Sequence, residues 1–294
     1  MLYHDIQIKA NTETEDSFSQ YEIHRHNSTK LILSTKRSGK ILFLGAGNCN
    51  DIDLITMIHN FSEVHLLDLD KNALLKGLKR QNININDVYL HIKDITQIID
   101  HYNKILRRSY IYQPDIKRAV ELLNRLQFPC IVQLKNNFDV VVSQCIISQI
   151  TFPITLILNN NIDRKFIETI QSFRDTLIRN HLLEMLNFLK EDGYGIVITD
   201  VVSSEAIPEL RSIDNIKTLE DILYSCYFRL KSNYYGMNIA GTNILRYIDE
   251  YDEFKKLIKL LTPTHFETVK WKWTFSNNKH YIVEASIFQK NPKA

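Results

Sequence analysis

The chain has 294 residues, of which 44% are hydrophobic and 24% are charged, and its 36 Lys and Arg nearly balance its 34 Asp and Glu. A disordered chain would show lower hydrophobicity or a larger net charge. A strongly electrostatic binder of nucleic acid or of a membrane surface would show an excess of one sign. No apolar run approaches the roughly 20 residues that span a bilayer. We therefore expect a globular protein with no membrane segment.

The compartment is predicted from the N-terminus and the cysteines. The first residues have neither the basic start nor the apolar stretch of a signal peptide. The four cysteines are Cys49, Cys130, Cys145 and Cys226. They are widely spaced, with no CxxC pair and no Cys/His spacing of a zinc site. We expect a cytoplasmic setting and no metal site.

Residues 1–35 precede the first apolar run. The pattern predicts one helix at about 16–33, with polar residues on most faces. Such a helix cannot bury much by itself, so we expect residues 1–35 to form a helical cap over the rest of the chain, 36–294.

The first strand is predicted at Lys40–Leu44, an unbroken apolar run that ends at Gly45-Ala46-Gly47. A run without polar alternation is typical of a strand buried on both faces in a parallel sheet. A helix is expected to follow at 51–60, with Asp51 or Asn50 as its N-cap.

Strands and helices then alternate. Strands are predicted at 64–67, 88–92, 138–142 and 196–199, and helices at 71–80, 97–127, 163–189, 216–230 and 251–261. This order is the signature of right-handed βαβ units. The last part changes to a period of two, with Trp271, Trp273 and Phe275 alternating with polar residues, and a second run covers 281–288. It predicts an antiparallel hairpin.

Two features indicate a nucleoside cofactor. The Gly45-Ala46-Gly47 turn lets a ligand approach the backbone between a strand and a helix. Asp68 ends the second strand 21 residues after Gly47, where a carboxylate can accept hydrogen bonds from both ribose hydroxyls. The third glycine of the dinucleotide fingerprint is replaced by Asn50, which argues against NAD or FAD.

At these motifs the chain resembles the class I S-adenosylmethionine-dependent methyltransferases, over about residues 38–288. The matching segments are Ile41–Asn48, Leu66–Asp70, Lys93–Ile95, Phe138–Gln144 and Leu189–Ile198, followed by the hairpin. The resemblance implies an α/β fold, a Rossmann-like three-layer sandwich whose mostly parallel seven-stranded sheet ends in an antiparallel β-hairpin. It also implies helical insertions near 97–135 and 151–180, which flank the fourth strand.

The resemblance implies S-adenosyl-L-methionine as the cofactor. The residues expected to bind it are Gly45, Ala46, Gly47, Asn48, Asp68, Leu69, Asp94, Ile95, Ser143 and Gln144. One position departs from the family pattern: the acid two residues before the first glycine is Phe43 here. Asp51 or Asp53 could substitute for it, although a helix cap or an exposed first-turn acid is the more ordinary role of either.

Methyl transfer depends mainly on aligning the acceptor with the methyl group, so the catalytic residue is hard to identify from sequence. The candidates are His24, Gln144 and Asp200, with Tyr21, Tyr234 and Tyr235 as substrate contacts and His26 also on the N-terminal segment. Structural roles are the simpler alternative for each. His265 is expected to be structural.

The acceptor is expected to be a small molecule or a peptide. The balanced charge and the absence of an Asn/Asp-Pro-Pro-aromatic box after the fourth strand weigh against nucleic acid. Two alternatives stay open. One is an aminopropyl transferase of the same fold, which usually has an acid where Ser143-Gln144 stands. The other is a non-catalytic binding or scaffold protein, favoured by Phe43. Sequence predicts nothing about the oligomeric state.

Overall fold

The computed structural model describes residues 3–96, 131–150, 167–205, 207–213, 215, 218, 221, 256–260 and 269–291. Within these residues the strands are β1 Lys40–Leu44, β2 Glu63–Asp68, β3 Tyr89–Ile92, β4 Phe138–Gln144, β5 Leu189–Ser203, β6 Ile258–Leu260, β7 Val269–Ser276 and β8 Lys279–Lys290. The α-helices are α1 Tyr3–Glu13, α2 Glu22–Ser34, α3 Leu54–Asn60, α4 Lys71–Arg80 and α8 Ile167–Phe188. Three short 3₁₀ turns are Ile85–Asp87, Val132–Leu134 and Pro208–Arg211.

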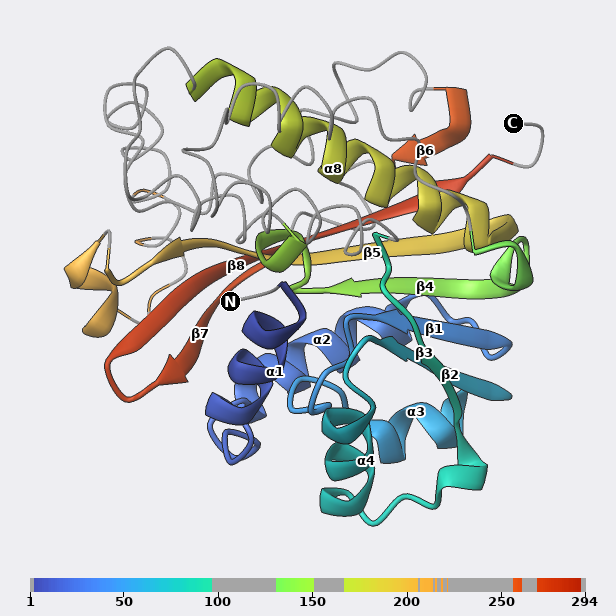
Figure 1. Ribbon diagram of the computed structural model, residues 1–294, viewed down its shortest axis with the longest axis horizontal. Coiled ribbons are helices and arrows are strands. Elements are labelled where there is room, and N and C mark those ends of the chain that lie inside the picture. The colour runs from blue at the N-terminus through green and yellow to red at the C-terminus, as the bar shows by residue number, and fades with distance from the viewer. Residues whose placement is uncertain are drawn as a thin grey trace, which may run out of the picture.

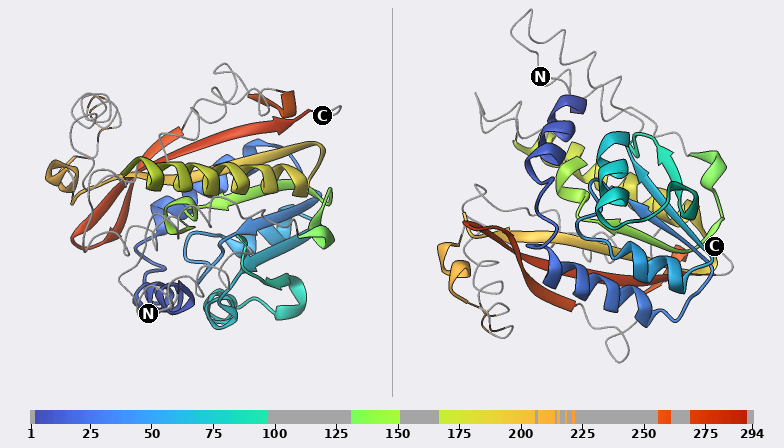
Figure 2. Two further views of the ribbon diagram at one scale, coloured as in Figure 1. Left: turned by 45° about the horizontal axis from the view of Figure 1, so that its top comes forward. Right: turned by 90° about the horizontal axis from the view of Figure 1, so that it is seen from below.

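The strands form one sheet in the order β3-β2-β1-β4-β5-β8-β6, with β7 also paired to β8 (Figure 1). The pairs among β1 to β5 are parallel, and β8 runs antiparallel to β5, β6 and β7. Helix α8 lies on one face of the sheet and α2 and α3 on the other (Figures 1 and 2). This is the predicted Rossmann-like three-layer α/β sandwich with a closing antiparallel hairpin, so the predicted fold class is confirmed.

The sheet has one strand more than the predicted seven. Strand β6 pairs with the far end of β8, with Ile258 opposite Lys290. The described part of the predicted helix at 251–261 therefore includes a strand, so that prediction is wrong there. A three-residue edge strand is too short for its period to show in the sequence, and its pairing with β8 is a tertiary contact.

The N-terminal prediction of one helix at 16–33 is also wrong. The structure has two helices, α1 and α2, joined by turns over 14–21. Helix α2 buries His24, Ser28, Leu31 and Ile32 against the sheet. Its buried face includes two polar residues, which is why the apolar periodicity of this segment is weak.

The helix after the glycine loop starts later than predicted. It begins at Leu54, and its N-cap is Asp53, whose side chain accepts a hydrogen bond from the backbone N–H of Thr56. Neither Asp51 nor Asn50 is the cap. Helix α4 covers the predicted 71–80, and Asp70 caps it by accepting from the N–H groups of Asn72 and Ala73.

Strand β5 is longer than the predicted 196–199. It follows α8 directly at Leu189, and its pairing with β4 shifts register between Phe138 and Val140. The shift accommodates the extra residues of β5 around Asp192, whose φ is 61°. The segment that contains Gly193 and Gly195 is thus part of β5, at a bulge in its pairing with β4.

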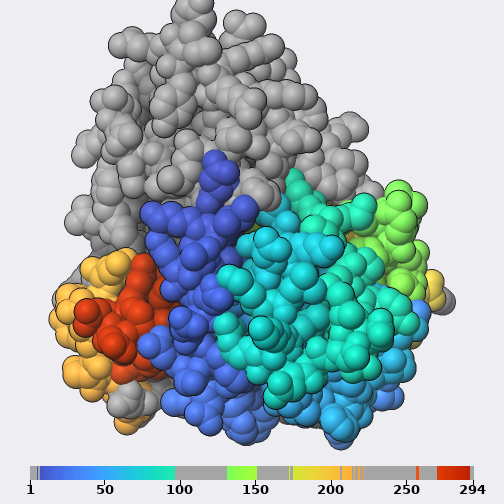
Figure 3. Space-filling model, turned by 60° about the horizontal axis from the view of Figure 1, so that its bottom comes forward, coloured from blue at the N-terminus to red at the C-terminus, as the bar shows by residue number. Residues whose placement is uncertain are grey.

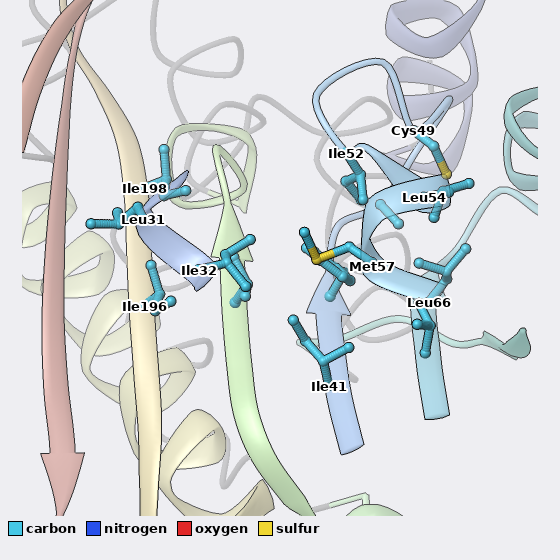
Figure 4. Packing of buried hydrophobic residues seen from close by; sticks show 14 of the residues in the cluster. Leu31, Ile32, Ile41, Cys49, Ile52, Leu54, Met57, Leu66, Ile196 and Ile198 are labelled. Atoms are coloured by element: carbon cyan, nitrogen blue, oxygen red, sulfur yellow. The ribbon is translucent and has the colours of Figure 1, made fainter. Parts of the chain in front are cut away.

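The larger core cluster fills the space between the sheet and the N-terminal helices. Leu31 and Ile32 of α2 and Met57 of α3 point toward Ile41 of β1 and Ile196 of β5 (Figure 4). All five of these side chains are buried. Cys49 and Cys145 are free thiols in this interior, as small buried residues. Cys130 and Cys226 lie outside the described residues.

Several predicted elements also lie outside the described residues: the helices at 97–127 and, for the most part, 216–230, and most of the insertions at 97–135 and 151–180. In the described part of the chain, no helix combines the length and the hydropathy that a membrane span requires.

Gly77 offers a test of the packing between α4 and the glycine loop. A Cβ at Gly77 would lie 2.5 Å from the backbone oxygen of Asn48. Alanine in a helix usually gains up to about 1 kcal/mol over glycine. Here the contact is with backbone and costs about 1–3 kcal/mol to relieve. We expect Gly77→Ala to lower the urea midpoint, whereas Lys79→Ala at an exposed α4 position should not. An unchanged or raised midpoint for Gly77→Ala would show that the backbone at Asn48 moves aside at little cost.

Candidate active site at the carboxyl ends of the strands

The strand order reverses between β1 and β4, and this reversal locates the candidate site. Strand β1 has β2 on one side and β4 on the other, all three parallel. Helix α3, which follows β1, and helix α8, which follows β4, lie on opposite faces, and such an arrangement leaves a crevice outside the carboxyl ends of these strands. The chain turns sharply after β1 and after β4. The backbone φ is 76° at Gly45 and 45° at Gly47, after β1, and 48° at Cys145, after β4. A left-handed non-glycine residue such as Cys145 is strained, and such strain concentrates at functional sites.

Asp68 holds the glycine loop in place. Its Oδ2 accepts a hydrogen bond from the Gly47 N–H at 2.8 Å, and its Oδ1 accepts from the Asp70 N–H at 2.8 Å. Burial raises the pKa of this carboxyl, and the two backbone donors act in the opposite direction. The predicted ribose acceptor is thus fixed beside the loop by the backbone.

A pocket opens beside this carboxylate. Of the predicted cofactor residues, the structure brings five together in its wall: Gly45, Asp68, Leu69, Asp94 and Ile95. The remaining lining is Gln7, Leu67, Lys93, Ile146, Gln149 and Ile150. The sequence did not indicate Gln7, Gln149 or Ile150, because they come from helices whose positions over the site are tertiary. Leucine and isoleucine beside a carboxylate suit a flat apolar ring that carries polar groups.

Helix α1 lies over the pocket mouth. Asn11 donates from Nδ2 to the Asp70 Oδ2 at 3.1 Å, and its backbone oxygen accepts from the Asn48 Nδ2 at 2.5 Å. The φ of Gly47 is 45°, and a Cβ there would lie 3.1 Å from the Asn11 Oδ1, so a larger residue would strain the backbone and press on the Asn11 side chain. Figure 3 shows the N-terminal segment between the terminal hairpin and α4. Gln7 of the same helix forms part of the pocket wall.

The end of β4 is buried, and its two predicted cofactor residues do not line this pocket. The Ser143 Oγ lies 2.8 Å from the His181 Nε2 of α8. The Gln144 side chain lies against His24 and Ser28 of α2. Both residues are at most 1% exposed. Gln144 Oε1 has no hydrogen-bond partner in the structure.

His24 does not have the properties of a general base. It is fully buried, and burial lowers its pKa to about 3. Its Nδ1 accepts a hydrogen bond from the Trp271 Nε1 at 3.0 Å, so a neutral ring carries its proton on Nε2. The ring also stacks on Trp273, with centroids 4.3 Å apart. These contacts join α2 to β7 and favour a structural role. His26, the other candidate histidine of this segment, is exposed.

Tyr21 and Asp200 share a region on the same side of the sheet. Tyr21 is 4% exposed, and its ring meets Trp273 edge-on, with centroids 4.8 Å apart. Burial raises the pKa of its phenol, and the charges of Asp51 and Asp200 raise it further. Its hydroxyl has no hydrogen-bond partner in the structure. Tyr234, Tyr235 and His265 lie outside the described residues.

Asp51, which the sequence leaves as one of two possible helix caps, is not the cap. Burial raises the pKa of its carboxyl to about 7, although its own backbone N–H and the charge of Arg25 act in the opposite direction. The signal that could have singled it out is the capping pattern of Asp53 and Thr56, which assigns the helix cap to the other acid. Among the described residues, no cluster of three His, Cys, Asp or Glu side chains could hold a metal ion.

Comparison with known proteins finds no matching family model and no matching curated protein. Among solved structures, the chain is similar to the N-methyltransferase NodS from Bradyrhizobium japonicum, at 11% identity and a TM-score of 0.44, over 95% of this chain and 99% of that one. A structure that concerns the conversion of a disulfide bond into a thioacetal group in echinomycin biosynthesis has 9% identity and a TM-score of 0.45, over 90% and 81%. TehB from Haemophilus influenzae has 12% identity and a TM-score of 0.42, over 90% and 62%. Similarities at these scores do not indicate a function, so the function is inferred from the residues of the site.

The protonation state of His24 can be measured. Because burial holds its pKa near 3, below that of an exposed histidine, its ring should stay neutral as the pH falls from 8 to 5. We expect its ¹⁵N shifts in long-range NMR spectra to show the Nε2–H tautomer without titration over this range. Assignment by the His24→Gln variant serves as the control. A titration midpoint between pH 6 and 7 would contradict the structural role.

Proposed function

We propose that the protein is a class I S-adenosyl-L-methionine-dependent methyltransferase that acts on a small molecule or a peptide. The observation that carries the proposal is the pocket at the β1/β4 reversal, where Gly45, Asp68, Leu69, Asp94 and Ile95 lie together. These residues come from three separate loops, each at the end of a parallel strand. Their convergence beside a glycine turn is the arrangement that a nucleoside cofactor requires.

The groups present fit the cofactor. Asp68 offers carboxylate oxygens to the ribose hydroxyls, and Leu69 and Ile95 offer apolar surface to the adenine. The Asp94 Oδ1 is already an acceptor, for the N–H and hydroxyl of Thr96, and Asp94 lines the pocket where an adenine amine would lie. The Gly45 and Gly47 turn leaves backbone exposed to the amino-acid part.

When bound, the cofactor supplies an electrophilic methyl group on a sulfonium. The chain's contribution is to align an acceptor with it and to exclude water, since alignment can supply much of the acceleration of such a displacement. The end of β4 and the neighbouring Tyr21 and Asp200 form the side where an acceptor would lie. Helix α1 contributes Gln7 to the pocket wall, and its Asn11 contacts Asn48 and Asp70 beside the glycine loop.

Of the catalytic candidates, Gln144 and Asp200 stay in this proposal and His24 does not. Gln144 is the last residue of β4, and Asp200 lies within β5, three residues before its end, and is 5% exposed. Gln144 is suited to orient an acceptor by hydrogen bonding, and Asp200 to accept a proton from it or to pair with its charge.

The proposal is tested by calorimetric titration of the protein with S-adenosylhomocysteine. We expect binding by the unmodified chain, and about 10- to 100-fold weaker binding by Asp68→Asn, because hydrogen bonds to a charged acceptor contribute about 1.5–3 kcal/mol. Asp87→Asn, the same change at an exposed position, should bind as the unmodified chain does. Thermal melting of each variant checks that it is folded. Absence of any binding by the unmodified chain would overturn the proposal.

A further inference from the structure

Asn50 stands where the dinucleotide fingerprint has its third glycine, and its side chain has defined partners. Its Nδ2 donates to the Thr14 backbone oxygen at 2.6 Å, and its Oδ1 accepts from the Arg80 Nη1 at 2.6 Å. Its backbone oxygen accepts from the Arg25 Nη1, also at 2.6 Å. The residue is 4% exposed. Asn50 therefore joins the turn after α1 to both α2 and α4.

A side chain is possible at position 50 because the close helix approach occurs elsewhere. In the fingerprint, the third glycine permits close packing between helix and strand. Here α4 makes the close approach to the loop, since a Cβ on Gly77 would lie 2.5 Å from the Asn48 backbone oxygen. Arg80 follows Gly77 by three residues, on the same side of the helix. It therefore reaches the Asn50 side chain.

The second asparagine of the loop holds the same part of the N-terminal segment. The Asn48 Nδ2 donates to the Asn11 backbone oxygen at 2.5 Å and lies 3.3 Å from the Thr14 Oγ1. Asn48 is 5% exposed. Two buried amides of one loop thus bind the end of α1 and the turn that follows it. Both donate to backbone oxygens of this segment, so the contacts fix its path.

Helix α4 supplies the positive charge that the end of α1 lacks. The last turn of α1 has no basic residue. The carbonyl groups at a helix C-terminus have no partners within the helix and interact favourably with cations. The Arg80 Nη2 donates to the Glu15 backbone oxygen just after α1. The Lys76 Nζ also lies 2.6 Å from the Glu15 Oε2, but this pair is too exposed to contribute much. Arg80 is therefore the main cation at this end.

Helix α1 depends on these contacts for its position. It has 11 residues, and an isolated helix shorter than about 12–15 residues is marginally stable in water. Figure 3 shows the N-terminal segment against α4. Gln7 of α1 lines the same pocket as Asp68 and Asp94 at the strand ends. A ligand that fills this pocket touches both α1 and the strand ends. It therefore favours the arrangement in which α1 is docked.

We propose that Asn50 and Arg80 are positioning residues that dock α1 on the glycine loop, and that a nucleoside ligand and the docked α1 stabilise each other. The identity of the ligand rests on the proposed function. Neither residue lines the pocket, so both act through α1. By linkage, the docked helix raises the affinity for the ligand by the same factor by which the ligand favours docking.

Hydrogen exchange of the α1 amides, measured with and without S-adenosylhomocysteine, tests the coupling in the unmodified chain. We expect the ligand to slow this exchange about 10-fold or more, within the usual range of coupling between two sites. Calorimetric titration of the same samples shows whether the ligand binds. The comparison needs no variant.

Two variants test the assignment to residues. Asn50→Ala removes both side-chain contacts of the amide, and Arg80→Met keeps the apolar stem but removes the donors. We expect each to speed exchange of α1 in the free protein and to weaken binding of S-adenosylhomocysteine, both about 10-fold. Asn72→Ala, at an exposed position of α4, is the matched control and should change neither. A purely structural role would lower the melting temperature but leave the affinity of the folded protein unchanged.

The outcomes separate the two proposals. If the unmodified chain does not bind S-adenosylhomocysteine, the proposed function and the coupling both fail. If it binds the ligand but the exchange of α1 does not change, the coupling fails and the proposed function stands. The same holds if a folded Asn50→Ala or Arg80→Met variant binds as tightly as the unmodified chain. Should one variant not fold, the other variant and the exchange in the unmodified chain still decide.

Discussion

The site depends on one carboxylate that two backbone N–H groups hold at the end of β2. Asp68 joins Gly47 of the loop after β1 to Asp70 at the start of α4, so that two neighbouring strand ends share one anchor. The same Asp70 caps α4 and accepts a hydrogen bond from Asn11 of α1. The glycine loop, the helix after β2 and the covering N-terminal helix are thus connected through two adjacent acids.

The other end of the N-terminal segment is fixed differently. The His24 ring of α2 accepts a hydrogen bond from Trp271 and stacks on Trp273, both in β7. Burial keeps that ring neutral, so the contact has no charge to desolvate further. Helix α2 is therefore joined to the terminal hairpin by apolar and neutral polar contacts, and α1 to the glycine loop by asparagine amides. Of the two helices, α1 is the one that contributes a residue, Gln7, to the pocket wall.

The sequence predicts the parallel half of the sheet well, because β1, β2 and β4 are buried on both faces and their residues form nearly unbroken apolar runs, such as Lys40–Leu44. It also predicts Asp68 beside the glycine loop, since the end of one parallel strand lies next to the end of its neighbour. It does not predict the split between α1 and α2, because their buried faces include His24 and Ser28. Strand β6 is missed because three residues carry no period, and only pairing with β8 makes them a strand.

Asp51 and Asp53 show a choice that the sequence leaves open and the structure decides: which acid caps α3. Both acids follow the same loop, and either could begin the helix by composition alone. The helix starts where Asp53 can reach Thr56, because its two carboxylate oxygens accept from the backbone N–H and from the hydroxyl of that residue. The loop before it, with φ of 45° at Gly47 and 51° at Cys49, decides which acid faces the first free N–H groups of the helix. That backbone geometry is not contained in the composition of the segment, so the sequence leaves the cap open and the structure decides it.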